Sequence, residues 1–260
     1  MTINVTGCYR VKTAGAKGGD SFGRDQKHGG RGALIAGNVI LAAGTQLSIV
    51  VGQAGGTAHT DEYASGGGGG GGSFVYRTLD NGLLMAAGGG GGASYKYDGQ
   101  PGEAGNNGTG SVGTEDPNQM GTGGINGNPG SNDQSTAAED RNPGGCGAGW
   151  LGRPAIARTR KEYGDRGGSR ADGWVGGSAG KGSLADGGFG GGGGGGAAAI
   201  KGAAGAGGGY SGGGAGSRSS YAGGGGGSFC GGIDCMATTG GNIKSEHGFV
   251  LLRLLVGACN

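Results

Sequence analysis

The chain has 260 residues, of which 79 are glycine and only five are proline. Collagen approaches this glycine content, but it requires glycine at strictly every third position and abundant proline, so the composition excludes a collagen triple helix. The 20 Lys and Arg and the 18 Asp and Glu are spread along the chain without the basic patch of a nucleic-acid-binding protein, so no nucleic-acid partner is expected.

The amino-terminal third predicts β-strands. Residues 8–16, "CYRVKTAGA", alternate at their start, and residues 32–53, "GALIAGNVILAAGTQLSIVVGQ", predict two strands joined by the turn "AAGT". The segments "SFVYR" and "LLMAA" are separated by "DNG", whose Asp80, Asn81 and Gly82 suit a tight reversal with positive φ. This pattern is typical of a β-hairpin.

Residues 88–227 have almost no strand or helix pattern. Glycine runs alternate there with segments in which glycine recurs at every third position, as at Gly121, Gly124, Gly127 and Gly130. Three residues per turn is the repeat of the extended left-handed polyproline-type helix. Such rods lack internal hydrogen bonds, so their N–H and C=O groups must pair with neighbouring rods or with water. The pattern predicts a bundle with all-glycine runs at its centre and period-three segments at its periphery.

A disordered insert is the alternative, because ordering the backbone costs about 1–2 kcal/mol per residue and glycine loses most. A β-sheet core at both chain ends would anchor an ordered bundle. Residues 247–257, "HGFVLLRLLVG", predict a final strand that returns to the sheet of the first strands. We therefore expect one composite domain, with strands in 1–87 and 228–260, a bundle in 88–227 that also contains the run 66–72, and little or no α-helix.

The cysteines predict two disulfides. Cys230 and Cys235 enclose only "GGID", while Cys8 and Cys259 lie near opposite chain ends, which often meet in a compact domain. Both pairings favour an oxidising compartment, whereas buried free thiols would fit a cytoplasm. Cys146 is left over. No metal site is expected, because the closely spaced cysteine and histidine ligands of a zinc site are absent from the sequence.

No catalytic constellation can be assembled from the sequence. His28, His59 and His247 are separated by long stretches, and the GxSxG matches at 176–180 and 209–213 do not lie between a strand and a helix, as a nucleophile elbow requires. We therefore predict that the protein is not an enzyme and uses no cofactor.

The segment 153–170, "RPAIARTRKEYGDRGGSR", is the largest break in the glycine pattern, and Trp150 and Trp174 flank it. Two interpretations are open: a basic recognition loop, or a solvated excursion with a short helical turn between two rods. The tryptophans then cap rod ends or mark an exposed binding spot. The candidate residues are Arg153, Arg158, Arg160, Lys161, Trp150 and Trp174. Asn4 and Asn107 begin candidate glycosylation sequons.

Several stretches together resemble a known family. They are "VVGQAG" (50–55), "GGGGGGGSFVYR" (66–77), "LLMAAGGGGGASY" (83–95), "GGFGGGGGGG" (187–196), "GGGYSGGGA" (207–215), "GGGGGSF" (223–229) and "HGFVLL" (247–252). In this order they resemble the extracellular glycine-rich domain of the anaplastic lymphoma kinase and leukocyte tyrosine kinase receptors. The resemblance implies an all-β, jelly-roll sandwich of the tumour necrosis factor type with an inserted bundle of polyglycine II helices.

The resemblance also implies a function. It predicts a rigid, non-enzymatic module for binding or adhesion that lies outside the cell or at its surface, or on a virion surface if Met1 is native. The expected partners are a protein or glycan at a surface, or copies of the chain itself, and the sequence contains no membrane-spanning stretch. The first alternative function is that of a self-assembling subunit of a fibre, coat or phage tail. The second is that of an ice-binding protein.

Overall fold

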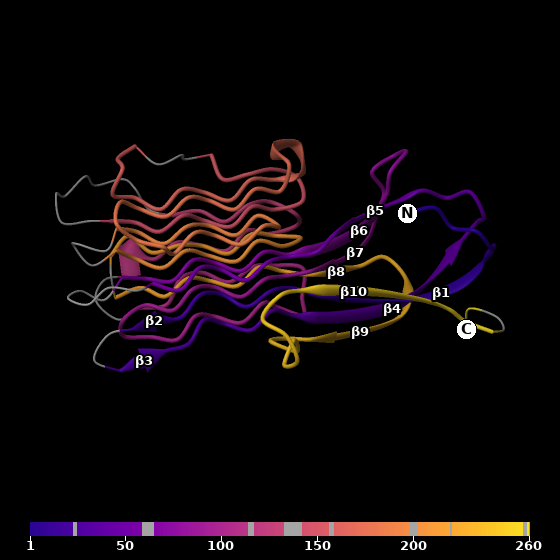
Figure 1. Cartoon of the computed structure of the whole chain (residues 1–260), viewed down its shortest axis with the longest axis horizontal. Coiled ribbons are helices and arrows are strands. Elements are labelled where there is room, and N and C mark those ends of the chain that lie inside the picture. Colours follow the sequence, from indigo (N-terminus) through magenta and orange to yellow (C-terminus); the bar gives the residue numbers. More distant parts are fainter. Residues whose placement is uncertain are drawn as a thin grey trace.

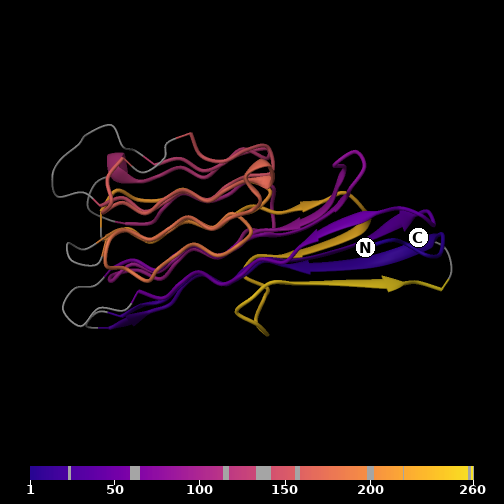
Figure 2. The same cartoon turned by 45° about the horizontal axis from the view of Figure 1, so that its top comes forward.

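The computed structural model describes residues 1–22, 25–58, 65–113, 117–132, 142–155, 159–197, 202–218, 220–256 and 259. The molecule is elongated (Figure 1). Both chain ends lie in the β-sheet half, and the glycine-rich segments run side by side through the other half, roughly along the same long axis (Figures 1 and 2).

The strands form two four-stranded antiparallel sheets, with the orders β10-β1-β4-β9 and β5-β6-β7-β8, and a separate β2-β3 pair. Their bounds are β1 (Gly7–Ala14), β2 (Ser21–Phe22), β3 (Gln26–Lys27), β4 (Leu34–Leu41), β5 (Leu47–Val50), β6 (Ser73–Arg77), β7 (Leu83–Ala87), β8 (Phe229–Cys230), β9 (Ile233–Thr238) and β10 (Phe249–Leu254). The helical elements in the described ranges are two 3-10 turns, η1 (Pro117–Gln119) and η2 (Arg170–Asp172). The prediction of an all-β fold is confirmed.

The predicted strands occur where the apolar patterns placed them. β6 and β7 form the predicted hairpin, and Asn81 in its turn has φ 55°. β10 returns to pair with β1. The two strands of residues 32–53 lie in different sheets, so the turn that joins β4 to β5 takes the chain from one layer to the other. β9 had no counterpart among the individually predicted strands.

The core lies between the two sheets. Alternate residues of each strand point inward because successive side chains of a strand face opposite ways. The buried apolar cluster contains residues from both layers: Ile3, Tyr9, Val11, Ala33, Ile35, Val39, Leu41, Leu47, Val75, Leu84, Met85 and Ala87. This shared cluster makes the two sheets a β-sandwich.

The run Gly66–Gly72 is hydrogen-bonded to several neighbouring segments in turn. The amides of Gly67 and Gly70 donate to the carbonyls of Ala93 and Gly90, at 2.8 Å each. Gly68 and Gly71 donate to a second segment, at the carbonyls of Gly56 and Gln53. Gly69 and Gly72 donate to a third segment, at the carbonyls of Gly193 and Gly190. From Gly67 to Gly72, amides three residues apart therefore donate to the same neighbouring segment, while the Gly66 amide donates to Gly202.

Close backbone packing explains why these positions are glycine. A Cβ atom on Gly69 would overlap the carbonyl oxygen of Ala206. Segment 121–130 was expected to be a peripheral rod. Its Gly121, Gly124, Gly127 and Gly130 are buried between mostly exposed residues, but the chain reverses at residues 126–127, where the Asn128 amide donates to the Ile125 carbonyl, so the segment is not one continuous rod. Segment 202–208 was also expected at the periphery, and this prediction is wrong. Its alanines at 203, 204 and 206 are fully buried, because a methyl group at these positions fits between the neighbouring rods.

Both predicted disulfides are present. Cys8 and Cys259 join the two ends of the chain, and Cys230 and Cys235 close the turn between β8 and β9. Their Cα atoms are 5.3 Å and 6.2 Å apart, within the range of protein disulfides. Two disulfides indicate an oxidising environment. Cys146 is a buried free thiol within the glycine-rich half.

Candidate functional site

An aromatic cluster, here called the seam, joins the glycine-rich half to the outer face of the second sheet. Phe74 and Tyr76 come from β6, while Trp150 and Trp174 come from loops at the sheet-side end of the glycine segments. The Phe74 and Trp174 rings stack with centroids 4.1 Å apart, and Trp150 meets the Tyr76 ring edge-on at 5.3 Å. Trp174 is only 5% exposed, so this tryptophan packs in the structure and contributes little free surface.

Basic and apolar side chains surround the seam. The Arg170 guanidinium lies over the Trp150 ring at 5.3 Å, a cation–π contact. Arg153 forms an ion pair of 2.7 Å with Asp172, in η2. Burial alone would raise the pKa of the Asp172 carboxyl, but hydrogen bonds from the hydroxyl and amide of Ser169, together with the charge of Arg153, hold that pKa below its usual value. The pair therefore stays ionised at neutral pH.

The charged segment 153–170 is divided between the two ends of the glycine-rich half. Arg153 lies beside the seam with Trp150 and Trp174, whereas Lys161 is bonded through its carbonyl to the amide of Lys181, and Arg160 accepts from the Tyr163 amide in the same distant turn. Arg158 lies outside the described residues. The structure therefore does not bring the predicted basic residues together.

The chain returns from that turn as an ordered glycine segment. Gly164 and Gly167 donate to the carbonyls of Pro143 and Cys146, so residues 164–167 run beside 143–146. The side chain of Arg166 donates to the carbonyls of Pro154 and Ala155, at 2.6 and 2.7 Å. This basic residue is used to hold the backbone of the excursion.

The two candidate glycosylation asparagines are exposed and lie in different halves of the molecule. Asn4 precedes β1 in the sandwich, and Asn107 lies in a bend of the glycine-rich half, where its Oδ1 accepts from the Asn126 amide at 3.4 Å. Their exposure leaves room for a glycan at either position.

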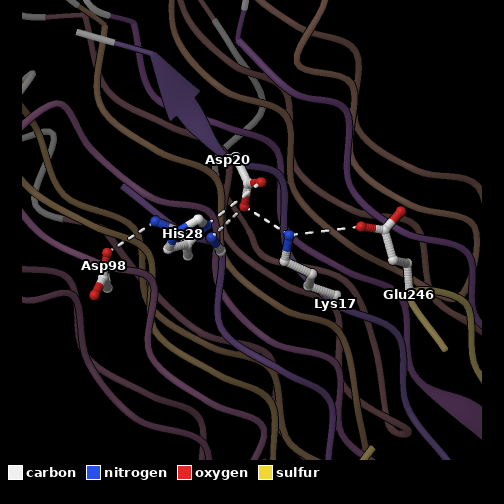
Figure 3. Close-up of polar contacts among 6 residues, drawn as sticks. Lys17, Asp20, His28, Asp98 and Glu246 are labelled. Carbon is white, nitrogen blue, oxygen red and sulfur yellow. Dashed lines mark hydrogen bonds and ion pairs between the residues drawn. The ribbon is translucent and has the colours of Figure 1, made fainter. Parts of the chain in front are cut away.

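A chain of charged groups links residues 17–28 to Glu246 of the β9–β10 loop, with Lys17 and Asp20 mostly buried (Figure 3). Lys17 Nζ is 2.7 Å from Asp20 Oδ1 and 3.7 Å from Glu246 Oε1, and His28 Nδ1 is 3.7 Å from Asp20 Oδ2. Burial would raise the pKa of Asp20, but the hydrogen bonds from Lys17 and the Gly29 amide, with the charges of Lys17 and His28, lower it below its usual value. Asp20 therefore remains a carboxylate that fixes the Lys17 ammonium.

A cavity of about 220 Å³ lies next to this chain of charges, and we call it the Lys17 cavity. Lys17, Arg31 and residues 242–246 of the β9–β10 loop line it. These residues are far apart in sequence and sit among glycines, so no local motif signals the cavity. The only available signal is the cluster of polar residues in "NIKSEH", an apolar-poor interruption directly before the last strand.

The other candidate groups do not form a reactive centre in the part of the chain that the structure describes. His28 and His247 belong to separate contacts, with His247 Nδ1 accepting from the Ala54 amide at 3.1 Å, and His59 lies outside the described ranges. Among the described residues, no group of three histidine, cysteine or acidic side chains is placed to hold a metal ion. Within the same ranges, no helix has the length and apolar character that crossing a membrane needs.

The outer face of the first sheet offers one further polar group. Arg10 donates to Asn38 Oδ1 at 3.0 Å and to the Asp234 carbonyl at 3.1 Å, and Asn38 Nδ2 donates to the Asp234 carboxylate. These bonds tie the edge strand β9 to β1 across β4. Their role in the molecule is to hold that edge in place.

No protein-family model matches this chain, and no curated protein matches its sequence.

Proposed function

We infer that this protein is a rigid, non-enzymatic module that works outside the cell or at its surface in binding or adhesion, as its resemblance to receptor glycine-rich domains suggests. We further propose that its glycine segments are polyglycine II helices, since successive amides rotate among three neighbours. The disulfides support the extracellular assignment, because such bonds persist in oxidising compartments.

The surface around the seam carries this proposal. Leu151 is 68% exposed and Val175 is 53% exposed, beside the Arg170–Trp150 pair. Aromatic and arginine side chains dominate the binding energy of protein interfaces, and they act best when a rigid base holds them. The seam provides that base, because the stacked Phe74 and Trp174 rings support Trp150 from below.

A binding measurement tests this surface. The labelled protein is added to panels of cells and immobilised surface glycans and proteins, alongside the variants Leu151→Asp and Val175→Asp. We expect saturable binding by the unchanged protein and a loss of about tenfold or more for either variant, because a charge would be forced into an apolar contact. Leu184→Asp, at the opposite end of the glycine-rich half and equally exposed at 70%, is the matched control. Equal binding by all the variants would exclude the seam surface.

A self-assembling subunit is the second candidate, and the edge strand β10 favours it. β10 pairs with β1 on one side only, and Leu251 is 59% exposed. An apolar edge strand is a template for pairing with another chain. Sedimentation at increasing protein concentration distinguishes the two functions: a persistent monomer argues against assembly, while filaments in negative stain would replace the receptor-like proposal.

A further inference from the structure

Of the four edges of the two sandwich sheets, β10 is the one without protection in the described part of the chain. β9 is bulged against β4, and Asp234 within it has φ 50°. β8 has only two residues, and β5 has four, the first of which, Leu47, exchanges hydrogen bonds of 2.8 and 2.9 Å with Met1. Bulges, short strands and covering segments block unwanted strand pairing. β10 instead pairs regularly with β1 along its whole length and runs along the outside of the sandwich (Figure 2).

The free edge of β10 presents unpaired backbone groups. The Leu255 amide donates to the Cys8 carbonyl at 2.8 Å, so the odd-numbered residues of this strand face β1. Successive N–H and C=O groups of a strand point to opposite sides, and those of Val250, Leu252 and Leu254 therefore point away from the sheet. No described residue is hydrogen-bonded to these groups. Up to three residues of β10 are thus ready to pair with a further strand.

The side chains along this edge are apolar and only partly covered. Val250 and Leu252 pack on the sandwich core but are only half-buried, and Leu254 is 43% exposed. On the outer face of the sheet, Leu251 is 59% exposed beside the exposed Arg253, which is the one charged residue of the strand. An open, apolar strand of this kind gains both hydrogen bonds and buried area when a second strand is added.

The sequence of β10 fits a second copy of itself in one antiparallel register. Edge-facing residues must lie opposite edge-facing residues, so a twofold axis passes through a residue of the strand. An axis through Arg253 would set two guanidinium groups directly opposite each other, which is unfavourable. An axis through Leu251 would bring Leu254 of the second copy beside Gly248, whose amide is already bonded to the Gly52 carbonyl at 2.8 Å. An axis through Leu252 avoids both conflicts.

This register is complementary on both faces of the sheet. On the inner face, Leu252 lies opposite its own copy and Val250 lies opposite Leu254 of the second copy, so every inner pair is apolar. On the outer face, Leu251 lies opposite Arg253 of the second copy, whose aliphatic stem can cover the leucine while its charge stays in water. The pattern Val-Leu-Leu-Arg-Leu of residues 250–254 is therefore compatible with itself when reversed about its centre.

We propose that two copies of this chain form a closed dimer by antiparallel pairing of β10, with Leu252 on the twofold axis. The first sheets of the two copies join into one continuous sheet whose outer strands are the two bulged β9 strands. Both open edges are used, so assembly stops at two chains and no fibre grows from them. The dimer goes beyond the binding function proposed above. The seam lies on the outer face of the other sheet, so each dimer presents two seams and binds a surface bivalently.

The first test measures association of the full, disulfide-bonded chain by sedimentation velocity over a wide range of protein concentrations. We expect a reversible equilibrium between monomer and dimer, because a contact confined to one strand per copy is small. Leu251→Lys should weaken the dimer by about tenfold, since it places an ammonium group opposite Arg253 of the second copy at two symmetric positions. Adding Arg253→Glu to Leu251→Lys should restore the dimer, because lysine then lies opposite glutamate.

A matched control separates the two edges of the same sheet. Met236→Lys places the same charge on the outer face at β9, where Met236 is 67% exposed, and should dimerise like the unchanged protein. Thermal unfolding of each variant verifies that the chain folds.

The second test follows amide hydrogen exchange of the ¹⁵N-labelled full chain at low and high concentration. Residues 249, 251 and 253 donate to β1 and should be protected at both concentrations. Residues 250, 252 and 254 should become protected only at high concentration, because their amides then donate to the second copy. This alternation is specific to edge pairing, since burial of a sheet face would not distinguish neighbouring amides.

Four results would overturn the proposal. A monomer at every concentration removes the dimer, and species larger than a dimer would replace the closed pair by open assembly. A dimer in which residues 250, 252 and 254 still exchange rapidly places the contact elsewhere. So does a dimer that Met236→Lys weakens and Leu251→Lys leaves intact. None of these outcomes decides surface binding by the seam, which Leu151→Asp and Val175→Asp test independently of the oligomeric state.

Discussion

At the scale of single residues, glycine is required at a position when a neighbouring backbone occupies the space of its side chain. Gly69 meets the Ala206 carbonyl in this way, whereas Gly105 has no atom within 4 Å of an added Cβ. Composition cannot distinguish the two positions, because each is one glycine among many. The distinction comes from which rods surround a segment.

Replacing Gly69 by alanine should therefore destabilise the protein, and replacing Gly105 should not. The added methyl group in Gly69→Ala forces two hydrogen-bonded rods apart, and overpacking of this kind costs about 1–3 kcal/mol. Gly105→Ala should change the free energy of unfolding by less than about 0.5 kcal/mol, as for an ordinary surface substitution. Chemical denaturation of both variants measures the difference. Equal stability of the two would contradict close packing at Gly69.

Cys146 should be an unreactive thiol in the folded protein. Burial raises the pKa of Cys146 to about 12, which the hydrogen bond with the Ala215 backbone only partly offsets. The thiolate is the reactive form, so almost none is present at about pH 8.5, where an ordinary thiol is half ionised. Iodoacetamide followed by mass spectrometry should detect no labelling of the native protein at that pH and full labelling in denaturant. Rapid native labelling would place Cys146 at the surface.

At the scale of elements, two glycine rods turn into strands at the same kind of residue. The runs ending at Gly72 and Gly227 are followed by Ser73 and Ser228, each directly before a phenylalanine that begins the aromatic packing. The Ser73 hydroxyl accepts from the Gly52 amide at 2.9 Å, and the Ser228 hydroxyl accepts from the Gly88 amide at 3.0 Å. Both serines are fully buried. Each serine thus satisfies an amide where the pattern of hydrogen bonding changes from rod to sheet.

Ser73→Ala tests this role, because the substitution keeps the backbone and removes only the acceptor. The Gly52 amide would be left buried without its partner, and an orphaned donor of this kind costs about 1–3 kcal/mol. Ser48→Ala is the control, since the Ser48 hydroxyl is paired with Thr78 at an exposed position. The midpoints of thermal unfolding should separate the two variants by several degrees. An unchanged midpoint for Ser73→Ala would mean that water replaces the hydroxyl.

The strands show what sequence alone can predict. Strands rich in β-branched, aromatic and leucine residues could be predicted from the sequence. They are β1, β4, β6, β7 and β10. β9 was not individually predicted because "IDCMAT" lies wholly exposed at a sheet edge and has no buried face to create an alternation. Which strands pair with one another also cannot be predicted from a local sequence pattern. The placement of β4 and β5 in two different sheets therefore became evident only in the structure.

The candidate sites likewise combine features that a local sequence pattern indicates with features that depend on the fold. The tryptophans could be recognised as a pair at the ends of the charged segment. Their packing on Phe74 could not, because Phe74 lies on a strand about 76 residues before Trp150 in the chain. The Lys17 cavity draws on residues from both chain ends. Neither contact has a short-range signature, so only the fold reveals them. The cysteine pairs were predictable because Cys230 and Cys235 enclose only four residues, while Cys8 and Cys259 lie near opposite chain ends, which often meet in a compact domain.

At the scale of the whole molecule, the two halves hold each other. The sandwich has a conventional apolar core, while the glycine-rich half has few side chains to bury and relies on hydrogen bonds between rods. A net hydrogen bond contributes only about 0.5–1.5 kcal/mol, close to the entropy lost in ordering one residue. The rods therefore gain stability from rigid attachment to the sheets, through the seam and the direct continuation of Gly66–Gly72 into β6.

This coupling predicts slow amide exchange along Gly66–Gly72. Each of these amides donates to another segment at 2.8–2.9 Å, and every residue of the run is buried, so exchange requires the bundle to open. Hydrogen exchange followed by mass spectrometry should show protection of this run comparable to that of β6, while the exposed turn 78–82 exchanges quickly. Because opening of the bundle depends on the sheets, Ser73→Ala should increase exchange along the run as well. Rapid exchange of Gly66–Gly72 in the unchanged protein, with β6 still protected, would instead show that the glycines are a flexible linker.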